Sequence, residues 1–149
     1  GNINVLEYNC RMGDPETQSI MLRLKSDLLT LVENAIDGTL NNIDAKWDCR
    51  AALGVVMAAY GYPEMPRQGD VIHGLSELIF KGDVGKDFHV FQAGTKVGGK
   101  DGKEIVTAGG RVLCVTALGD DIKNARYRAY EISNQIYFDG FQMRADIGL

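Results

Sequence analysis

The sequence has few of the residues that build disulfide frameworks or zinc sites. Its 149 residues include three cysteines, and no two of them form a C-x-x-C pair. Cys10, Cys49 and Cys114 are widely spaced and odd in number, which argues against a disulfide framework and against structural zinc. Unpaired cysteines are typical of a reducing compartment, so we expect a cytoplasmic protein.

Long apolar runs and an excess of positive charge are also missing. No stretch reaches the roughly 18 apolar residues of a membrane-spanning helix, and no signal-peptide pattern opens the chain. The net charge of −4 and the pI of about 5.1 offer no basic surface for a nucleic acid or an anionic membrane. We therefore expect neither a nucleic acid nor a membrane among the partners.

Histidine and tryptophan are rare. The two histidines, His73 and His89, have no neighbouring residue pattern that marks a catalytic triad, so structural or surface roles are expected for both. The single tryptophan, Trp47, stands among charged residues and is expected to pack across a boundary between two parts of the chain.

The residues that are present predict an α+β protein in two parts. Residues 1–45 contain a predicted strand and then helix, whereas residues 46–149 contain several short antiparallel strands and one long helix packed on them. The expected strands are residues 4–10, 51–59, 71–75, 87–93, 104–107 and 112–118, and the expected helices are 15–20, 26–37 and 121–136. Ser26 or Asp27 is expected to cap the second helix, and Asp120 or Asp121 the long one.

The stretch from Val5 to Glu16 carries the main candidate site. In a strand, Glu7 and Asn9 lie on one face because side chains alternate. A carboxylate and an amide oxygen suit a hard cation such as Mg²⁺, which leaves its other positions to water and phosphate. Arg11 follows on the same face, and its permanent charge suits phosphate. A solvated sheet face without a metal is the competing interpretation.

Two further segments have both structural and functional interpretations. Asp14-Pro15-Glu16 reads as an N-cap, a proline at the first helical position and an acid in the first turn. Gly109-Gly110-Arg111 offers backbone N–H groups and a guanidinium to a phosphate, or forms a bulge or turn between strands. The segment 93–96 likewise places Thr95 and Lys96 at a ligand or forms a strand-to-hairpin turn.

The string E-Y-N-C-R-M-G-D-P-E-T-Q resembles the signature of the phosphoribosylamine–glycine ligases (glycinamide ribonucleotide synthetases) of the ATP-grasp superfamily. Residues 11–18 carry most of the resemblance. Further similar segments follow in the family's order: L-R-L-K-S-D-L-L from Leu22, L-G-V-V-M-A-A from Leu53, G-D-V-I-H-G-L from Gly69, T-A-G-G-R-V-L-C-V-T-A-L-G-D from Thr107, and R-A-D-I-G near the end. The order of these segments corresponds to the C-terminal third of the family's sequences.

The resemblance implies that residues 1–45 complete an ATP-grasp domain and that residues 46–149 form the C-terminal domain. It implies ATP-dependent joining of 5-phosphoribosylamine to glycine through glycyl phosphate, in purine biosynthesis. It also implies Glu7 and Asn9 as Mg²⁺ or Mn²⁺ ligands, Arg11 at phosphate in the catalytic site, and Gly110 and Arg111 at the sugar phosphate. The chain would have been cut from a longer one and, without the nucleotide-binding part, would not catalyse the reaction alone.

Three residues depart from the family pattern. Tyr60 replaces a glycine, Gln92 a histidine and Ala145 a lysine. Because Gln92 precedes the A-G-T-K loop at residues 93–96, any role of that loop that needs the imidazole of a histidine is in doubt. The alternative hypothesis is a stand-alone α+β module that holds a metabolite, with the first strand and helix as a cap.

Overall fold

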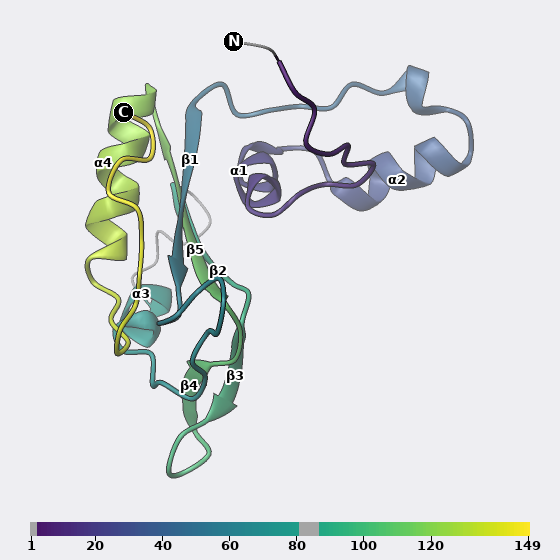
Figure 1. The fold of residues 1–149 in the computed structure, drawn as a ribbon. Coiled ribbons are helices and arrows are strands. Elements are labelled where there is room, and N and C mark those ends of the chain that lie inside the picture. The colour runs from purple at the N-terminus through teal and green to yellow at the C-terminus, as the bar shows by residue number, and fades with distance from the viewer. Residues whose placement is uncertain (1–2, 81–86) are drawn as a thin grey trace.

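The computed structural model describes residues 3–80 and 87–149 and has the expected α+β architecture (Figure 1). A three-stranded antiparallel sheet has the order β1-β5-β2, and β3 and β4 form a separate hairpin. The strands are β1 (Ala51–Ala58), β2 (Phe88–Gln92), β3 (Thr95–Gly98), β4 (Glu104–Thr107) and β5 (Arg111–Gly119). The helices are α1 (Glu16–Arg23), α2 (Leu28–Ile36), α3 (Leu75–Phe80) and α4 (Ile122–Ser133), with a 3₁₀ turn η1 (Leu40–Asn42).

The sheet has a helix on each face. Strand β5 is central, with Val115 opposite Val55 of β1 and Val90 of β2. These valines face α4, whose Ala125 and Ala129 are fully buried against them in one apolar core. Alternate residues point to the other face, which α1 covers (Figure 1). Because β5 is covered on both sides, residues 112–118 are all buried and form an apolar run that only Thr116 interrupts.

The helix caps follow local sequence chemistry at two places. The Asp27 carboxylate accepts from the Thr30 amide at 2.8 Å, and Asp121 accepts from the Asn124 amide at 2.7 Å. Gly38 ends α2 with a positive φ of 69°, as a glycine after a helix commonly does. The sequence predicted two candidate cap residues for each of these helices, and in the structure Asp27 and Asp121 are the caps.

Three predicted elements differ from the structure. Residues 3–9 have no regular secondary structure, because no strand of the described chain pairs with them and a strand needs such a partner. Asp14 does not cap α1, which instead begins with the Thr17 amide bonded to the Gly13 carbonyl at 3.1 Å. The predicted strand 71–75 is reduced to isolated bridges at Val71 and His73, and Leu75 begins the unexpected helix α3.

A short backbone crossing joins the first helices to the sheet. The Asp48 amide donates to the Arg23 carbonyl at 2.7 Å, and the Lys25 amide donates to the Lys46 carbonyl at 2.9 Å. Trp47 lies in this crossing, paired with Leu24 and about half exposed. The charged side chains of Lys25 and Asp48 add an ion pair of 3.0 Å.

In the part of the chain that the structure describes, no helix combines the length and the apolar character needed to cross a membrane.

Candidate functional site

Glu7 and Asn9 are neighbours in space even though their backbone is not a strand. The Asn9 amide nitrogen donates to the Glu7 Oε1 atom at 3.0 Å, and both side chains are exposed. The sequence prediction that these two side chains lie together therefore agrees with the geometry, by a direct hydrogen bond rather than by strand alternation.

This pair has the donor atoms that a hard cation takes. Rotating the Asn9 amide would place its oxygen beside the Glu7 carboxylate. Two such oxygens can bind a cation between them. Among the described residues no group of three or more histidine, cysteine or acidic side chains is placed to hold a metal.

The Arg11 guanidinium contacts the backbone of the neighbouring residue, Met12. Its Nη1 atom donates to the Met12 carbonyl at 3.1 Å, and the side chain is exposed. In the described structure no hydrogen bond or ion pair joins Arg11 to Glu7 or Asn9. The structure thus brings two of the three predicted residues together and leaves the third close in sequence but separate in contacts.

Arg111 connects strand β5 to the segment that follows Glu7, Asn9 and Arg11 in the chain. Its Nε atom lies 3.2 Å from Asp14 Oδ2, and its Nη1 donates to the Asp14 carbonyl at 3.3 Å. The two residues are 97 positions apart and both side chains are about two-fifths exposed. The Asp14 carboxylate, expected at a helix cap, therefore pairs with the arginine of the Gly110-Arg111 segment.

The glycines before Arg111 are required by close packing. A Cβ on Gly109 would lie 3.2 Å from the Gly94 Cα, and a Cβ on Gly110 would lie 2.5 Å from the Tyr62 ring. The Gly110 carbonyl accepts from the Ala59 amide at 2.8 Å. The turn interpretation of this segment thus explains its glycines, while Arg111 remains available for a functional role.

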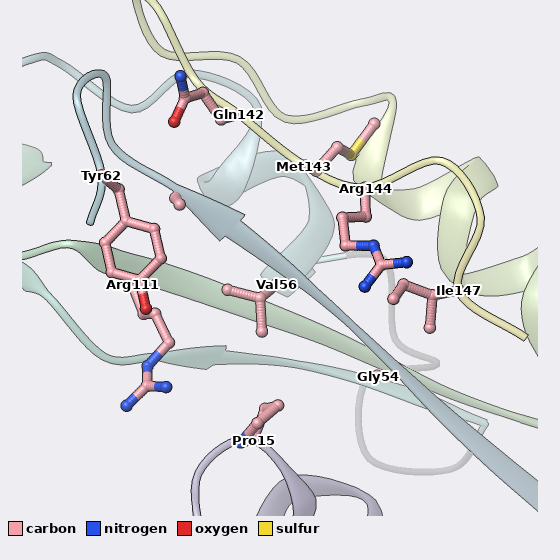
Figure 2. Close-up of a pocket in the computed structure, with 10 residues that line it drawn as sticks. Pro15, Gly54, Val56, Tyr62, Arg111, Gln142, Met143, Arg144 and Ile147 are labelled. Carbon is pink, nitrogen blue, oxygen red and sulfur yellow. The ribbon is translucent and has the colours of Figure 1, made fainter. Parts of the chain in front are cut away.

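Beside Arg111 lies a cavity of about 450 Å³ (Figure 2). Strand β1 forms its floor, Tyr62 and Arg111 lie on one side, and Arg144 lies on the other (Figure 2). Pro15 closes it from the first part of the chain. The remaining lining residues are Gly54, Val56, Ala58, Gln142, Met143 and Ile147. A volume of this size holds a small metabolite.

Sequence reasoning did not find the cavity residues other than Arg111. Tyr62, Gln142 and Arg144 come from a loop and from the C-terminal tail, so no motif or spacing joins them. Tail and sheet meet because Ala58 and Gln142 exchange backbone hydrogen bonds of 2.8 and 2.9 Å. Close to Gly54 of the cavity lining, burial raises the pKa of the Cys114 thiol, which therefore stays protonated and unreactive at neutral pH.

The three departures from the family pattern have structural contacts of their own. Tyr60 lies under the Arg67 guanidinium at 5.3 Å, and Arg67 also pairs with Asp139 at 2.6 Å. The Gln92 Oε1 atom accepts from the Thr95 hydroxyl at 3.0 Å. The Ala145 carbonyl accepts from Arg126 at 2.8 Å, so its contact uses the backbone alone.

Comparisons with known proteins agree on one family. The profile of the phosphoribosylglycinamide synthetase C domain matches residues 52–149. Proteins named phosphoribosylamine–glycine ligase from Vibrio vulnificus and Escherichia coli O157:H7 are 51% and 53% identical over 148 residues. These alignments include 99% of this chain but 33% of each relative, so the chain spans about a third of their length.

A solved structure gives the same result. The crystal structure of phosphoribosylamine–glycine ligase from Thermotoga maritima has a TM-score of 0.67 and 32% identity, over 96% of this chain and 33% of that one. The profile match, the relatives and the shared fold all lead to one conclusion: the chain belongs to the phosphoribosylglycinamide synthetase family.

Proposed function

We propose that this chain is the C-terminal third of a cytoplasmic, ATP-dependent phosphoribosylamine–glycine ligase that acts in purine biosynthesis. The observation that carries the proposal is the 51–53% identity to such ligases along 99% of the chain. The whole reaction joins glycine to 5-phosphoribosylamine. The glycine carboxylate takes the γ-phosphoryl group of ATP, and the amine then attacks glycyl phosphate and releases phosphate.

In this reaction the first segment of the chain holds charge near the phosphates. Glu7 and Asn9 would bind Mg²⁺ or Mn²⁺, an assignment supported by their 3.0 Å contact. When bound, the metal neutralises phosphate charge, which is the main electrostatic need of phosphoryl transfer. Arg11 is exposed beside them and would bind a phosphate oxygen through its guanidinium.

The sugar phosphate would bind at Gly110 and Arg111. This assignment is supported by the half-exposed guanidinium of Arg111 at the wall of the 450 Å³ cavity. Arginine suits this role because its planar N–H fork matches two phosphate oxygens. The Asp14–Arg111 ion pair would hold the sugar-phosphate side of the site against the segment that follows the metal ligands.

We assign residues 1–45 to the end of an ATP-grasp domain and residues 46–149 to the C-terminal domain. The start of the profile match at residue 52 supports this boundary. The family's nucleotide-binding lysines and adenine pocket would lie in the other two thirds of the ligase. The alternative of a stand-alone metabolite-binding module is not favoured, because the relatives are ligases of three times this length.

The test is the substitution Glu7→Ala in the complete ligase. We expect loss of ligation with an unchanged melting temperature, since Glu7 is exposed and its contact with Asn9 is local. Ligation would be followed by phosphate release that depends on both glycine and 5-phosphoribosylamine.

The matched control is Glu33→Ala, which removes an exposed carboxylate from α2. This variant should retain full turnover. Near-normal turnover of the Glu7→Ala enzyme would remove Glu7 from the metal site, whereas equal losses in both variants would point to a general charge effect.

A further inference from the structure

Asp14 makes contacts that helix capping does not explain. Its Oδ2 atom pairs with Arg111 Nε at 3.2 Å, and its carbonyl accepts from Arg111 Nη1 at 3.3 Å. The carboxylate therefore fixes one edge of a guanidinium that lies 97 residues away in the chain. No backbone amide of α1 donates to this side chain, and the first turn uses the Gly13 carbonyl instead.

Gln18 fixes the second oxygen of the same carboxylate. Its Nε2 atom donates to Asp14 Oδ1 at 3.0 Å, one helical turn away. With Oδ1 held by Gln18 and Oδ2 by Arg111, the carboxylate cannot rotate without breaking a contact. The Gln18 Oε1 atom is buried and has no partner in the described residues. A helix surface alone gives no reason to keep an amide in this position.

The pairing leaves part of the Arg111 guanidinium available. Arginine has five N–H groups; one of those on Nη1 donates to the Asp14 carbonyl, and Nε lies at the ion-pair distance of 3.2 Å from Asp14 Oδ2. Within the described chain, Nη2 has no recorded partner. Arg111 lines the cavity next to Tyr62 (Figure 2), and its backbone is held by the close approach of Gly94 to Gly109. An oxyanion in the cavity can therefore reach the Nη1–Nη2 edge.

We infer that Asp14 and Gln18 are positioning residues, which turn the free edge of the Arg111 guanidinium toward the phosphate group of the sugar substrate. The inference rests on the proposed function. Asp14 would have two opposite effects on phosphate binding. Its negative charge repels the phosphate, whereas its contact with Arg111 fixes the direction in which the guanidinium donates. Loss of the carboxylate therefore weakens phosphate binding only if orientation outweighs the gain in positive charge.

The test compares variants in the complete ligase. Asp14→Ala should raise the KM for 5-phosphoribosylamine about tenfold, with kcat within about threefold and the KM values for glycine and ATP unchanged. Asp14→Asn should lower the KM again to about the level of Gln18→Leu, because its amide oxygen can still face Arg111 Nε while its NH2 group cannot accept from Gln18. Gln18→Leu should raise the same KM by a smaller factor, since it leaves the carboxylate in place but free to rotate.

Two further variants separate this inference from the alternatives. Arg111→Ala should raise the KM, and adding Asp14→Ala to it should cause no further increase if Asp14 acts through Arg111. Asp121→Ala, which removes the capping carboxylate of α4, should lower the melting temperature and leave the KM unchanged.

Each outcome decides the inference. If Arg111→Ala raises the KM while Asp14→Ala and Gln18→Leu do not, the positioning role is wrong and the phosphate site stands. If Asp14→Ala does not fold, Gln18→Leu carries the same prediction, and an unchanged KM in that variant overturns it. Absence of ligation in the unsubstituted enzyme would instead refute the proposed function.

Discussion

Asp48 is a buried carboxylate with cationic partners from both parts of the chain. Arg50 contacts both of its oxygens, at 3.0 and 2.9 Å, and Lys25 lies 3.0 Å from Oδ2. The side-chain hydrogen bond from Arg50 is the main cause that holds the pKa of Asp48 well below its ordinary value. The spacing D-x-R is visible in the sequence, but Lys25 is too distant for any pattern to place it there.

Replacing Asp48 should destabilise the protein in a pH-dependent way. Asp48→Asn leaves the partly exposed Arg50 and the exposed Lys25 without their carboxylate, so we expect a loss of about 2 kcal/mol in unfolding free energy at pH 7. Because the folded-state pKa is lowered, the contribution of Asp48 is complete above the unfolded pKa of about 3.9 and declines as the pH falls through the folded value. Urea unfolding from pH 7 down to pH 2 measures both effects.

The control for this substitution is Asp44→Asn, which changes an exposed aspartate four residues earlier. It should shift the unfolding free energy by less than about 0.5 kcal/mol. A loss at Asp48 that stayed constant from pH 7 to pH 2 would contradict the ionic explanation and indicate a packing defect.

At the level of elements, the sequence predicts those whose pattern is long or strongly biased. Strands β1 and β5 and helix α4 agree with prediction because a β-branched run and a repeated helical spacing each have one structural interpretation. Helix α3 was missed because its six residues are too short to show a period, and β-branched Val71 and Ile72 precede it. The chain turns at Gly74, which has a positive φ of 82°.

The functional segments show the same division. The proximity of Glu7 to Asn9 could be predicted, since residues two apart in an extended chain share a side. The Asp14–Arg111 pair could not be, because its partners are 97 residues apart and Asp14-Pro15-Glu16 fits a helix start equally well. Local chemistry alone gave the wrong role for Asp14.

Helix α1 can approach the sheet because Gly54 has no side chain. A Cβ there would lie 3.1 Å from Cys114 Sγ and 3.4 Å from the Ser19 hydroxyl of α1. Gly54→Val adds two further methyl groups at this contact, so we expect about 1–3 kcal/mol of destabilisation. Limited proteolysis should then cleave residues 14–24 faster than in the unsubstituted protein.

The comparison variant is Val56→Ile, on the same face of β1. Its extra methylene points to the cavity of about 450 Å³ rather than to α1, and it should leave both stability and proteolysis nearly unchanged. Equal effects of the two substitutions would show that the face as a whole, rather than the contact at Gly54, limits the packing.

At the level of the whole molecule, the chain carries the proposed metal ligands Glu7 and Asn9 without the rest of the proposed nucleotide site. We therefore expect the 149-residue chain to bind Mg-ATP weakly, because two ligands and one arginine leave the base and ribose without partners. Isothermal calorimetry with Mg-ATP, and with Mg²⁺ alone as the reference, measures this. A dissociation constant below about 10 µM would contradict the assignment.

Trp47, in the backbone crossing between the first helices and the sheet, is an intrinsic fluorescence probe. It is the single tryptophan, it is half exposed, and it lies where the first helices meet the sheet. Its emission colour and its quenching by iodide therefore report the solvent around this junction without any attached dye. In this 149-residue chain, a rearrangement between the first helices and the sheet on titration with Mg-ATP would be visible as a spectral shift from one identified residue.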